Sequence, residues 1–562
     1  MFFRIRPASG GDRISPLPFG TYMIRRFLRI LLLSIVAIAW LPAQSHPPRL
    51  VVFVSVDQLK GNVFDRFDSL FTDGFRTMRS DGLRFSRATL NYAPSETGPG
   101  HATMSTGCYP WKHGICSNDW INTATEKEIY CVEDTAAEAQ EPGHSIVSPR
   151  NLLRPAIGDW LKAASPASKV IALSIKDRAA ILMGGRHPDL ALWFDHDSEH
   201  MISSDYYPAP LPAWVTAFNA SRWMDHHLPE AWTLLLPDSV YRTFGPDDMP
   251  GERRWDTCRT FPHPFMPIQR VDQCIMSPYG NAMLLDLARQ AVDGERLGRR
   301  DTTDLLCISL SSTDYIGHAF GPDSWEMIDN LVRLDRQLGD FLRFLTSRVG
   351  REHLLVVLTA DHGALPLPEY AQDMHTMQAR RISAADINRP ILALDSLLRV
   401  RYHATEHVIL QNEYVNERVA RSAGITPEAL AEEVRTGLLR IPGIADVYLR
   451  AELESRSTDG RPFLEQYRHG FVPERGGDFV IRFCEGCLVT NGSTGTSHGS
   501  PYFYDTNVPI LFWGPRMAVH RVDRDVHTVD IAPTLARIIG IAPPSDIDGI
   551  ALPEVPAPAG TQ

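Results

Sequence analysis

Continuous apolar, β-branched runs limit the fold of this 562-residue chain more than any other feature. Runs without polar alternation are typical of strands that are buried on both faces of a sheet. Helical stretches such as 324–345 and 529–539 lie between or after them. Strands that alternate with helices predict an α/β fold in which helices sandwich a mostly parallel sheet. The runs are 50–56, 170–174, 305–310, 354–358 and 509–513.

Charged residues follow four of these runs, where a parallel sheet gathers its ligands. Asp57, Lys176, Asp314 and Asp361 each lie just beyond a strand. Each alone is typical of a turn or helix cap. Together with three histidines, however, the aspartates match the ligands of two zinc ions with open positions. The six candidate metal ligands are Asp57, Asp314, His318, Asp361, His362 and His498.

Asp314 and His318 are four residues apart, so one helical turn would place both on the same ion. Asp361 and His362 are adjacent ligands from a single turn. Thr97, in the stretch Ser-Glu-Thr-Gly-Pro-Gly-His, offers a hydroxyl as a candidate nucleophile. It could instead cap a helix, and a helix N-terminus there would itself favour an anion. The pattern indicates a two-metal hydrolase and fits a phosphate substrate best.

Lys176 and Arg178 favour a phosphate monoester as the substrate. In an extended segment their side chains point to the same side. The arginine fork can hold a pair of phosphoryl oxygens while the lysine adds a point charge. A diester replaces one charged oxygen with an ester group and would leave this pair underused. The alternative is an exposed, charged strand end.

The overall charge argues against a nucleic-acid polymer as ligand. Net charge is −11, and no basic face is evident, whereas phosphate-backbone binding requires one. An anionic substrate must therefore be attracted by local charge. The hydrophobic fraction of 44% is that of an ordinary globular protein. The sequence does not indicate an oligomeric state.

The first 45 residues read as a secretory signal peptide. Arg25, Arg26 and Arg29 precede an apolar run, 30–41, that small residues follow. This run would form ~18 Å of helix, short of the ~30 Å hydrocarbon core. We therefore expect a periplasmic or secreted protein without a membrane attachment after cleavage, with a membrane anchor as the alternative. Met23 is a possible true start.

Residues 46–562 form the predicted catalytic domain. Two long segments, about 184–278 and about 366–496, interrupt the strand–helix rhythm, and we expect them to form a cap at the active-site side, the second as a small α+β unit. Eight cysteines fit an exported protein. Cys307 lies in an apolar run and is expected to be a buried thiol. Three near pairs are candidate bridges: Cys116–Cys131, Cys258–Cys274 and Cys484–Cys487.

These motifs, in this order, resemble the alkaline phosphatase superfamily. The chain is most similar to the bacterial phosphate-irrepressible alkaline phosphatases, which use a threonine nucleophile. The resemblance covers nearly all of the mature chain and extends to residues 528–535. It rests on Asp57, Thr97-Gly-Pro-Gly-His, Asn118, Lys176-x-Arg178, Asp314-x-x-x-His318, Asp361-His362 and His498.

The resemblance implies a role for each motif. Asp314, His318 and His498 would hold one zinc ion. Asp57, Asp361 and His362 would hold the other, on which Thr97 would act as nucleophile and become phosphorylated. Asn118 would donate its amide to a phosphoryl oxygen. Lys176 would replace a third metal, so no magnesium site is expected. Phosphate monoesters would be the substrates and inorganic phosphate a product.

Two rivals remain open. A phosphodiesterase or nucleotide pyrophosphatase of the same superfamily shares the zinc ligands, the threonine and the asparagine. It typically lacks the Lys-x-Arg pair, which Lys176 and Arg178 supply here. A non-catalytic metal- or phosphate-binding protein is the rival from another class. The physiological substrate and the pH optimum stay open at this stage.

Overall fold

The computed structural model describes residues 46–556 except 123–126, 138–145, 208–209, 456–459, 516 and 518–519. The predicted signal peptide and Met23 therefore lie outside the described residues. Among the helices that are described, none is long and apolar enough to cross a membrane.

A nine-stranded sheet forms the centre of the fold, in the order β19-β2-β18-β11-β1-β10-β5-β6-β7. Five neighbouring strands, β11, β1, β10, β5 and β6, are parallel. β18 runs antiparallel to both β11 and β2, and β7 runs antiparallel to β6. The predicted, mostly parallel α/β sheet is confirmed, with residues 509–513 as an antiparallel member. The strands are β1 (Leu50–Val56), β2 (Leu83–Thr89), β5 (Val170–Ser174), β6 (Leu190–Phe194), β7 (Met201–Ile202), β10 (Asp304–Leu310), β11 (Leu354–Thr359), β18 (Ile510–Trp513) and β19 (His520–His527).

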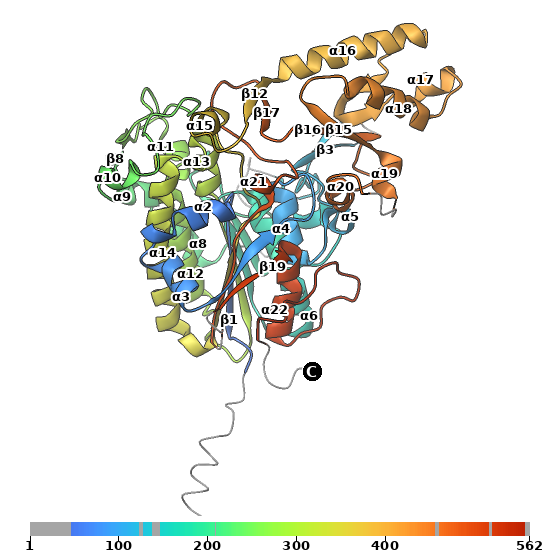
Figure 1. Cartoon of the computed structure of the whole chain (residues 1–562). Helices are drawn as coiled ribbons and strands as arrows, with labels where there is room; N and C mark the ends of the chain where they lie inside the picture. Colours follow the sequence, from blue (N-terminus) through green and yellow to red (C-terminus); the bar gives the residue numbers. More distant parts are fainter. Residues whose placement is uncertain are drawn as a thin grey trace, which may run out of the picture. The chain divides into compact units, whose positions relative to one another are not determined.

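Helices cover both faces of the sheet (Figure 1). Val54 and Val56 of β1 belong to one apolar cluster, while Val51 and Phe53 belong to the other, because side chains alternate along a strand. Both faces of β1 are therefore buried, which explains its continuous apolar sequence. The first face carries α3 (Gly74–Ser80), α12 (Pro278–Gly294) and α14 (Trp325–Val349); the second carries α4 (Thr97–Thr106), α6 (Ile157–Ala164), α7 (Asp177–Gly184) and α22 (Ile531–Ile539).

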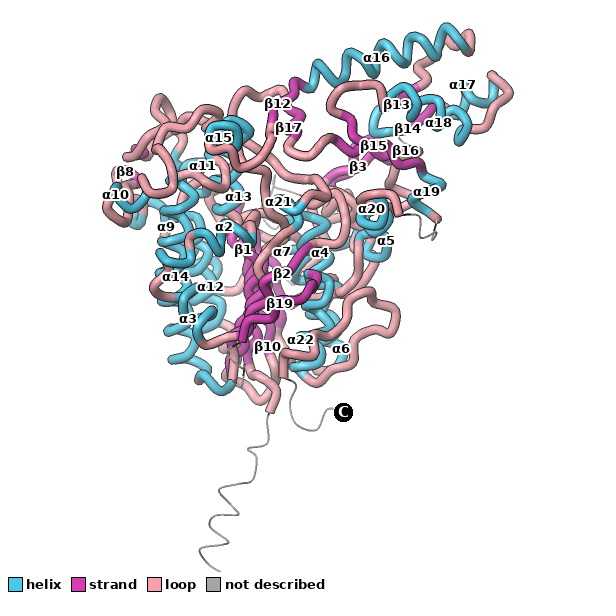
Figure 2. Tube along the Cα trace, viewed as in Figure 1, coloured by secondary structure: helices cyan, strands magenta, loops and turns pink. Residues whose placement is uncertain are grey.

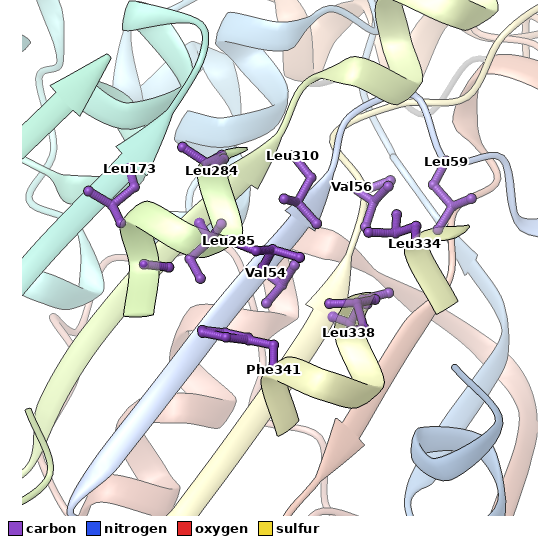
Figure 3. Packing of buried hydrophobic residues seen from close by; sticks show 14 of the residues in the cluster. Val54, Val56, Leu59, Leu173, Leu284, Leu285, Leu310, Leu334, Leu338 and Phe341 are labelled. Carbon is purple, nitrogen blue, oxygen red and sulfur yellow. The ribbon is translucent and has the colours of Figure 1, made fainter. Parts of the chain in front are cut away.

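The core on the first face is tightly interdigitated. Figure 3 shows Leu334 and Leu338 of α14 beside Val54 and Val56 of β1. Burying one such side chain contributes about 1.5–3 kcal/mol. This packing fixes β1, and with it the residue that follows β1, Asp57.

The segment 184–278 is an insertion only in part. β6 and β7 lie within it, yet they extend the central sheet, because the apolar run of β6 pairs with β5. After Ile202 the segment forms no further strand of this sheet among its described residues. It contains α8 (Ala213–Ala220), α9 (Trp223–His227), α10 (Asp238–Tyr241), α11 (Arg270–Ile275) and the pair β8 (Ala231–Trp232) and β9 (His263–Pro264).

The segment 366–496 combines small sheets with helices (Figure 2). Its own apolar cluster includes Leu430, Val447 and Phe479. It is tied to the sheet domain where the Ala93 N–H donates to the Gln466 carbonyl at 3.0 Å. Its elements are α15 (Pro368–Asp373), β12 (Arg380–Ser383), α16 (Ala384–Arg401), β13 (Ile409–Leu410), β14 (Tyr414–Val415), α17 (Glu417–Ser422), α18 (Pro427–Leu438), β15 (Ile444–Leu449), α19 (Arg450–Glu454), α20 (Leu464–Gly470), β16 (Phe479–Phe483) and β17 (Cys487–Thr490).

One of the three candidate disulfides is formed, between Cys484 and Cys487. The other two pairs are wrong: all four of their cysteines carry free thiols, three of them buried. Cys307 is a buried thiol, as expected. Proximity in sequence does not fix the distance and angle that a disulfide requires; Cys116 and Cys131 even belong to one apolar cluster without a bond between them. The four free thiols of the predicted pairs are Cys116, Cys131, Cys258 and Cys274.

Candidate metal centre

The carboxyl ends of four parallel strands bring the predicted residues together. Asp57 follows β1, and its N–H donates to the Leu310 carbonyl at the end of β10 at 3.2 Å. Asp361 and His362 follow β11. Asp314 and His318 lie on α13 (Ser312–Phe320), which begins directly after β10, and the loop before α21 (Phe503–Thr506) supplies His498.

The three imidazoles are fixed in the same way. Each Nδ1 donates to a backbone carbonyl: His318 to Thr496 at 2.8 Å, His362 to Gly363 at 3.0 Å, and His498 to Ser95 at 2.7 Å. A proton on Nδ1 leaves the lone pair on Nε2, which is the form that ligates a metal. The sequence folds to present three such lone pairs to one place.

The Nε2 atoms face the carboxylates. His318 Nε2 lies 3.2 Å from Asp314 Oδ1, and His362 Nε2 lies 3.3 Å from Asp361 Oδ2. One group of possible ligand atoms contains Asp314, His318 and His498, as the sequence predicts for the first ion. A second contains Asp57, Asp314 and His362, with ligand atoms in each group within 4.8 Å of one another. Asp314 thus belongs to both groups, whereas Asp361, predicted for the second, is not a member of it and lies beside it next to His362.

These residues could hold metal cations. Asp57 Oδ1 and Asp361 Oδ2 are buried, and no described residue offers either a hydrogen bond. An unpaired carboxylate oxygen in the interior is costly unless a proton or a metal compensates it. Carboxylate oxygens with imidazole nitrogens are a donor set that zinc accepts.

The electrostatics show the same deficit of positive charge. Burial, reinforced by Asp361, raises the pKa of Asp57 to about 7. Burial also raises the pKa of Asp361 to about 6, against the pull of Lys176. Burial alone would raise the pKa of Asp314 too, but His318 and Lys176 hold it well below its ordinary value. One ammonium group does not neutralise three buried carboxylates.

Lys176 lies inside the carboxylate cluster. Its Nζ donates to Asp57 Oδ2 at 2.7 Å and to Asp314 Oδ2 at 2.6 Å. Although burial would lower the pKa of Lys176, Asp314 and Asp57 raise it above its ordinary value, so the ammonium stays charged. Its position bridges the two groups of candidate ligands.

The predicted extended geometry of Lys176 and Arg178 is wrong. Lys176 has extended backbone angles, but Arg178 is the second residue of α7. The chain turns into a helix there, so the strand alternation on which the prediction relied does not apply. The partly buried Arg178 guanidinium donates to the Tyr130 hydroxyl through Nη1 at 3.3 Å, and its Nε has no partner among the described residues. The Tyr130 hydroxyl in turn donates to Asp177 at 2.6 Å.

Thr97 is the first residue of α4, and its Oγ1 lies 3.5 Å from His362 Nε2. The residue before the helix is Glu96, so Thr97 does not serve as the N-cap. The positive end of the α4 dipole favours an anion beside the hydroxyl, although Pro99 has no N–H and the Gly98 N–H is already paired. Asn118 Oδ1 accepts from the Gly98 N–H at 2.8 Å, which leaves its amide NH₂ as the free donor.

Several residues that support the centre were not predicted from the sequence. Gln58, in the left-handed region at φ +66°, donates its N–H to Asp361 at 3.1 Å and its Nε2 to Asp314 at 2.6 Å. Glu96 accepts from the Asn118 N–H at 2.7 Å. The sequence signal for Gln58 and Glu96 is that they lie directly beside Asp57 and Thr97. His101 supports the turn at Thr97, since its Nδ1 donates to the Thr97 carbonyl at 2.8 Å.

A cavity of about 560 Å³ adjoins this centre. Its lining includes His498, Glu96 and Ser117, which are a candidate ligand and the neighbours of Thr97 and Asn118. Residues of the segment 366–496 form much of the remaining wall. This segment therefore lines the cavity beside the centre, and its role as a cap stays a prediction.

Comparison with known proteins places the chain among phosphate-ester hydrolases. The profile of the type I phosphodiesterase / nucleotide pyrophosphatase family matches residues 51–501. The chain is similar to the alkaline phosphatase PhoV of Synechococcus elongatus, with 32% identity over 517 residues, 89% of this chain and 91% of the relative. It is 31% identical to the alkaline phosphatase PafA of Elizabethkingia meningoseptica over 525 residues, 90% of this chain and 94% of the relative. The crystal structure of PafA superposes with a TM-score of 0.83 over 91% of this chain and 99% of that chain.

Proposed function

Because the chain belongs to the type I phosphodiesterase / nucleotide pyrophosphatase family, we propose that it hydrolyses phosphate monoesters as an alkaline phosphatase. Relatives that share nearly its whole length bear that name. The observation that carries the proposal is Lys176, whose ammonium lies between Asp57 and Asp314 at the centre of the ligand cluster. With metal ions bound beside Lys176 and Arg178, the centre would carry the positive charge that a dianionic phosphoryl group requires.

Thr97 is the proposed nucleophile. As its Oγ1 forms a bond to phosphorus, the ester P–O bond breaks, and the proton of the hydroxyl passes through solvent to the leaving oxygen, which departs as the alcohol. Water then cleaves the phospho-threonine and releases inorganic phosphate. His101 and Glu96 hold the turn that presents Thr97, through the Thr97 carbonyl and through Asn118.

Two zinc ions are the proposed cofactors. Asp314, His318 and His498 would hold one, and Asp57, Asp361 and His362 the other, with Thr97 beside the second. When bound, the ions would lower the pKa of the nucleophile and stabilise the attacking and leaving oxygens. No magnesium site is proposed, since Lys176 supplies the additional positive charge.

The phosphoryl oxygens are assigned to donors of this chain. The Asn118 amide has its oxygen engaged by Gly98, so its NH₂ can donate to one oxygen. Lys176 has used two of its three N–H donors on Asp57 and Asp314, and the third is free for the substrate. Arg178 would hold a further oxygen through its fork.

The protein is proposed to act in the periplasm or outside the cell. The support is the charged segment, the apolar run and the small residues within positions 25–45. N-terminal sequencing of the mature protein from fractionated cells tests it. An intact N-terminus in the cytoplasmic fraction would contradict export.

The test of function compares matched aryl phosphate mono- and diesters. We expect kcat/KM of the zinc-loaded protein to favour the monoester strongly. In the double variant Lys176→Ala/Arg178→Ala, monoester activity should fall far more than diester activity. A wild-type preference for the diester would instead support a phosphodiesterase, the activity for which the family is named. Activity on neither, with zinc bound, would support a binding protein.

A further inference from the structure

The cavity beside the metal centre lies where the alcohol of a phosphate ester would leave. Thr97 Oγ1 lies near His362, and neither residue lines the cavity, whereas His498 of the other ligand group does. In an in-line displacement the leaving oxygen departs opposite the attacking one. The cavity volume of about 560 Å³ suits a small organic group.

Aromatic side chains form much of the cavity wall. Trp120 comes from β3 (Asp119–Asn122), Tyr414 from β14 and Tyr467 from α20, with Phe471 just beyond that helix. Flat apolar rings offer stacking and edge contacts to an aromatic guest. They also attract a cation placed over a ring face.

The charges on this wall are mainly negative. Glu96, Asp119 and Glu413 line it, and Arg475 is the single Lys or Arg among the described lining residues. Arg475 is already engaged, since it stacks over the Trp120 ring at 4.4 Å and donates to the Asn151 carbonyl at 3.2 Å. Once the proposed metal ions occupy the centre around Lys176, the cavity would have the opposite charge to that phosphoryl site.

Glu413 stands out on this wall. Its Oε1 accepts from the Ile481 N–H at 2.8 Å, while the described residues offer Oε2 no hydrogen bond. Its backbone lies in the left-handed region at φ +68°, which is strained for a residue with a side chain. Burial also raises its pKa to about 7. A partly buried carboxylate on a strained backbone, with one oxygen available in an aromatic cavity, can accept from a donor group of a bound molecule.

We propose that this cavity binds the alcohol portion of the phosphate monoester and that Glu413 selects alcohols that carry an aromatic ring and a protonated amine. This inference rests on the proposed phosphomonoesterase activity. The dianionic phosphoryl group would enter the cationic centre, and the ammonium group would enter the acidic, aromatic cavity. Glu413 is thus a specificity-determining residue that touches the substrate away from the reacting bond.

The test uses two esters of matched shape and leaving group, 4-(2-aminoethyl)phenyl phosphate and 4-propylphenyl phosphate. At about pH 8.5, where Glu413 is ionised and the amine still protonated, we expect kcat/KM for the amine to exceed that for the propyl ester about tenfold. Glu413→Gln should reduce this ratio to near one and leave kcat/KM for the propyl ester unchanged. Glu417→Gln, which alters an exposed carboxylate of the same segment, should keep the wild-type ratio.

Failure of the inference is distinguishable from failure of the proposed function. Hydrolysis of the propyl ester reports phosphomonoesterase activity alone, whatever Glu413 does. Equal kcat/KM for the two esters in the wild type, or an unchanged ratio in Glu413→Gln, would overturn the selection of amines. Calorimetry of both esters on Thr97→Ala measures binding without turnover; equal dissociation constants there would overturn it as well.

Discussion

The reactivity of the Thr97 hydroxyl should depend on the groups around it. The side chain lies at the start of α4 and 3.5 Å from His362. Thr97→Ala should lower kcat by about a thousandfold or more, since a nucleophile and its electrostatic partners act as a unit. Thr97→Ser keeps the hydroxyl and should retain most of the activity. Quenched-flow mass spectrometry should detect a phosphoryl group on residue 97 of the wild type. Wild-type turnover in Thr97→Ala would refute this role.

Gln58 orients two candidate ligands, Asp314 and Asp361, and would affect metal binding through them. Its Nε2 donates to Asp314, while its backbone N–H donates to Asp361. Gln58→Ala removes only the first bond and should weaken zinc binding about 10–100-fold, the range for residues that orient ligands. Competition with a chromogenic chelator measures this affinity. Gln58→Gly, which relieves the positive φ, should show the same loss; full affinity in Gln58→Gly would assign the effect to backbone strain instead.

At the scale of elements, the sequence predicted those that are buried on both sides. Continuous apolar runs identified β1, β5, β10 and β11, and the residues after them form the centre. β2 and β19 were not predicted, because their sequences mix charged and apolar residues. They lie at the side of the sheet where β18 runs in the opposite direction. The direction of a strand depends on how the chain connects it to the others, and local sequence patterns do not encode this. The same limit explains Arg178, since helix α7 begins one residue before it.

The carboxyl group of Glu413 should make the stability of the fold depend on pH. Burial raises the pKa of Glu413 from 4.5 to about 7, so the folded protein keeps a proton that the unfolded chain has lost between these values. Stability should therefore fall as pH rises through this window, by at most on the order of 3 kcal/mol, and stay lower above it. Glu413→Gln should remove this loss and melt higher than wild type above pH 7, with little difference near pH 4.5. Thermal unfolding with Glu417→Gln as control measures it; identical pH profiles of wild type and Glu413→Gln would contradict the assignment.

At the scale of the whole molecule, the metal centre joins distant parts of the chain. Its candidate ligands run from Asp57 to His498 and come from two strand ends, from α13 and from the loop before α21. Without cations, the buried carboxylates must be neutralised by protons or by Lys176 alone. Metal binding should therefore stabilise the assembled domain as well as enable catalysis.

Removal of metal tests this coupling. Chelation should abolish phosphatase activity and lower Tm, because a ligand present at about 1,000 times its Kd contributes about 4 kcal/mol to folding.

Zinc should restore both activity and Tm, whereas magnesium alone should restore neither, since imidazole nitrogens suit zinc and Lys176 supplies the remaining charge. A Tm that chelation leaves unchanged, with zinc shown to be removed, would mean that the centre does not contribute to folding stability; recovery with magnesium alone would overturn the choice of metal.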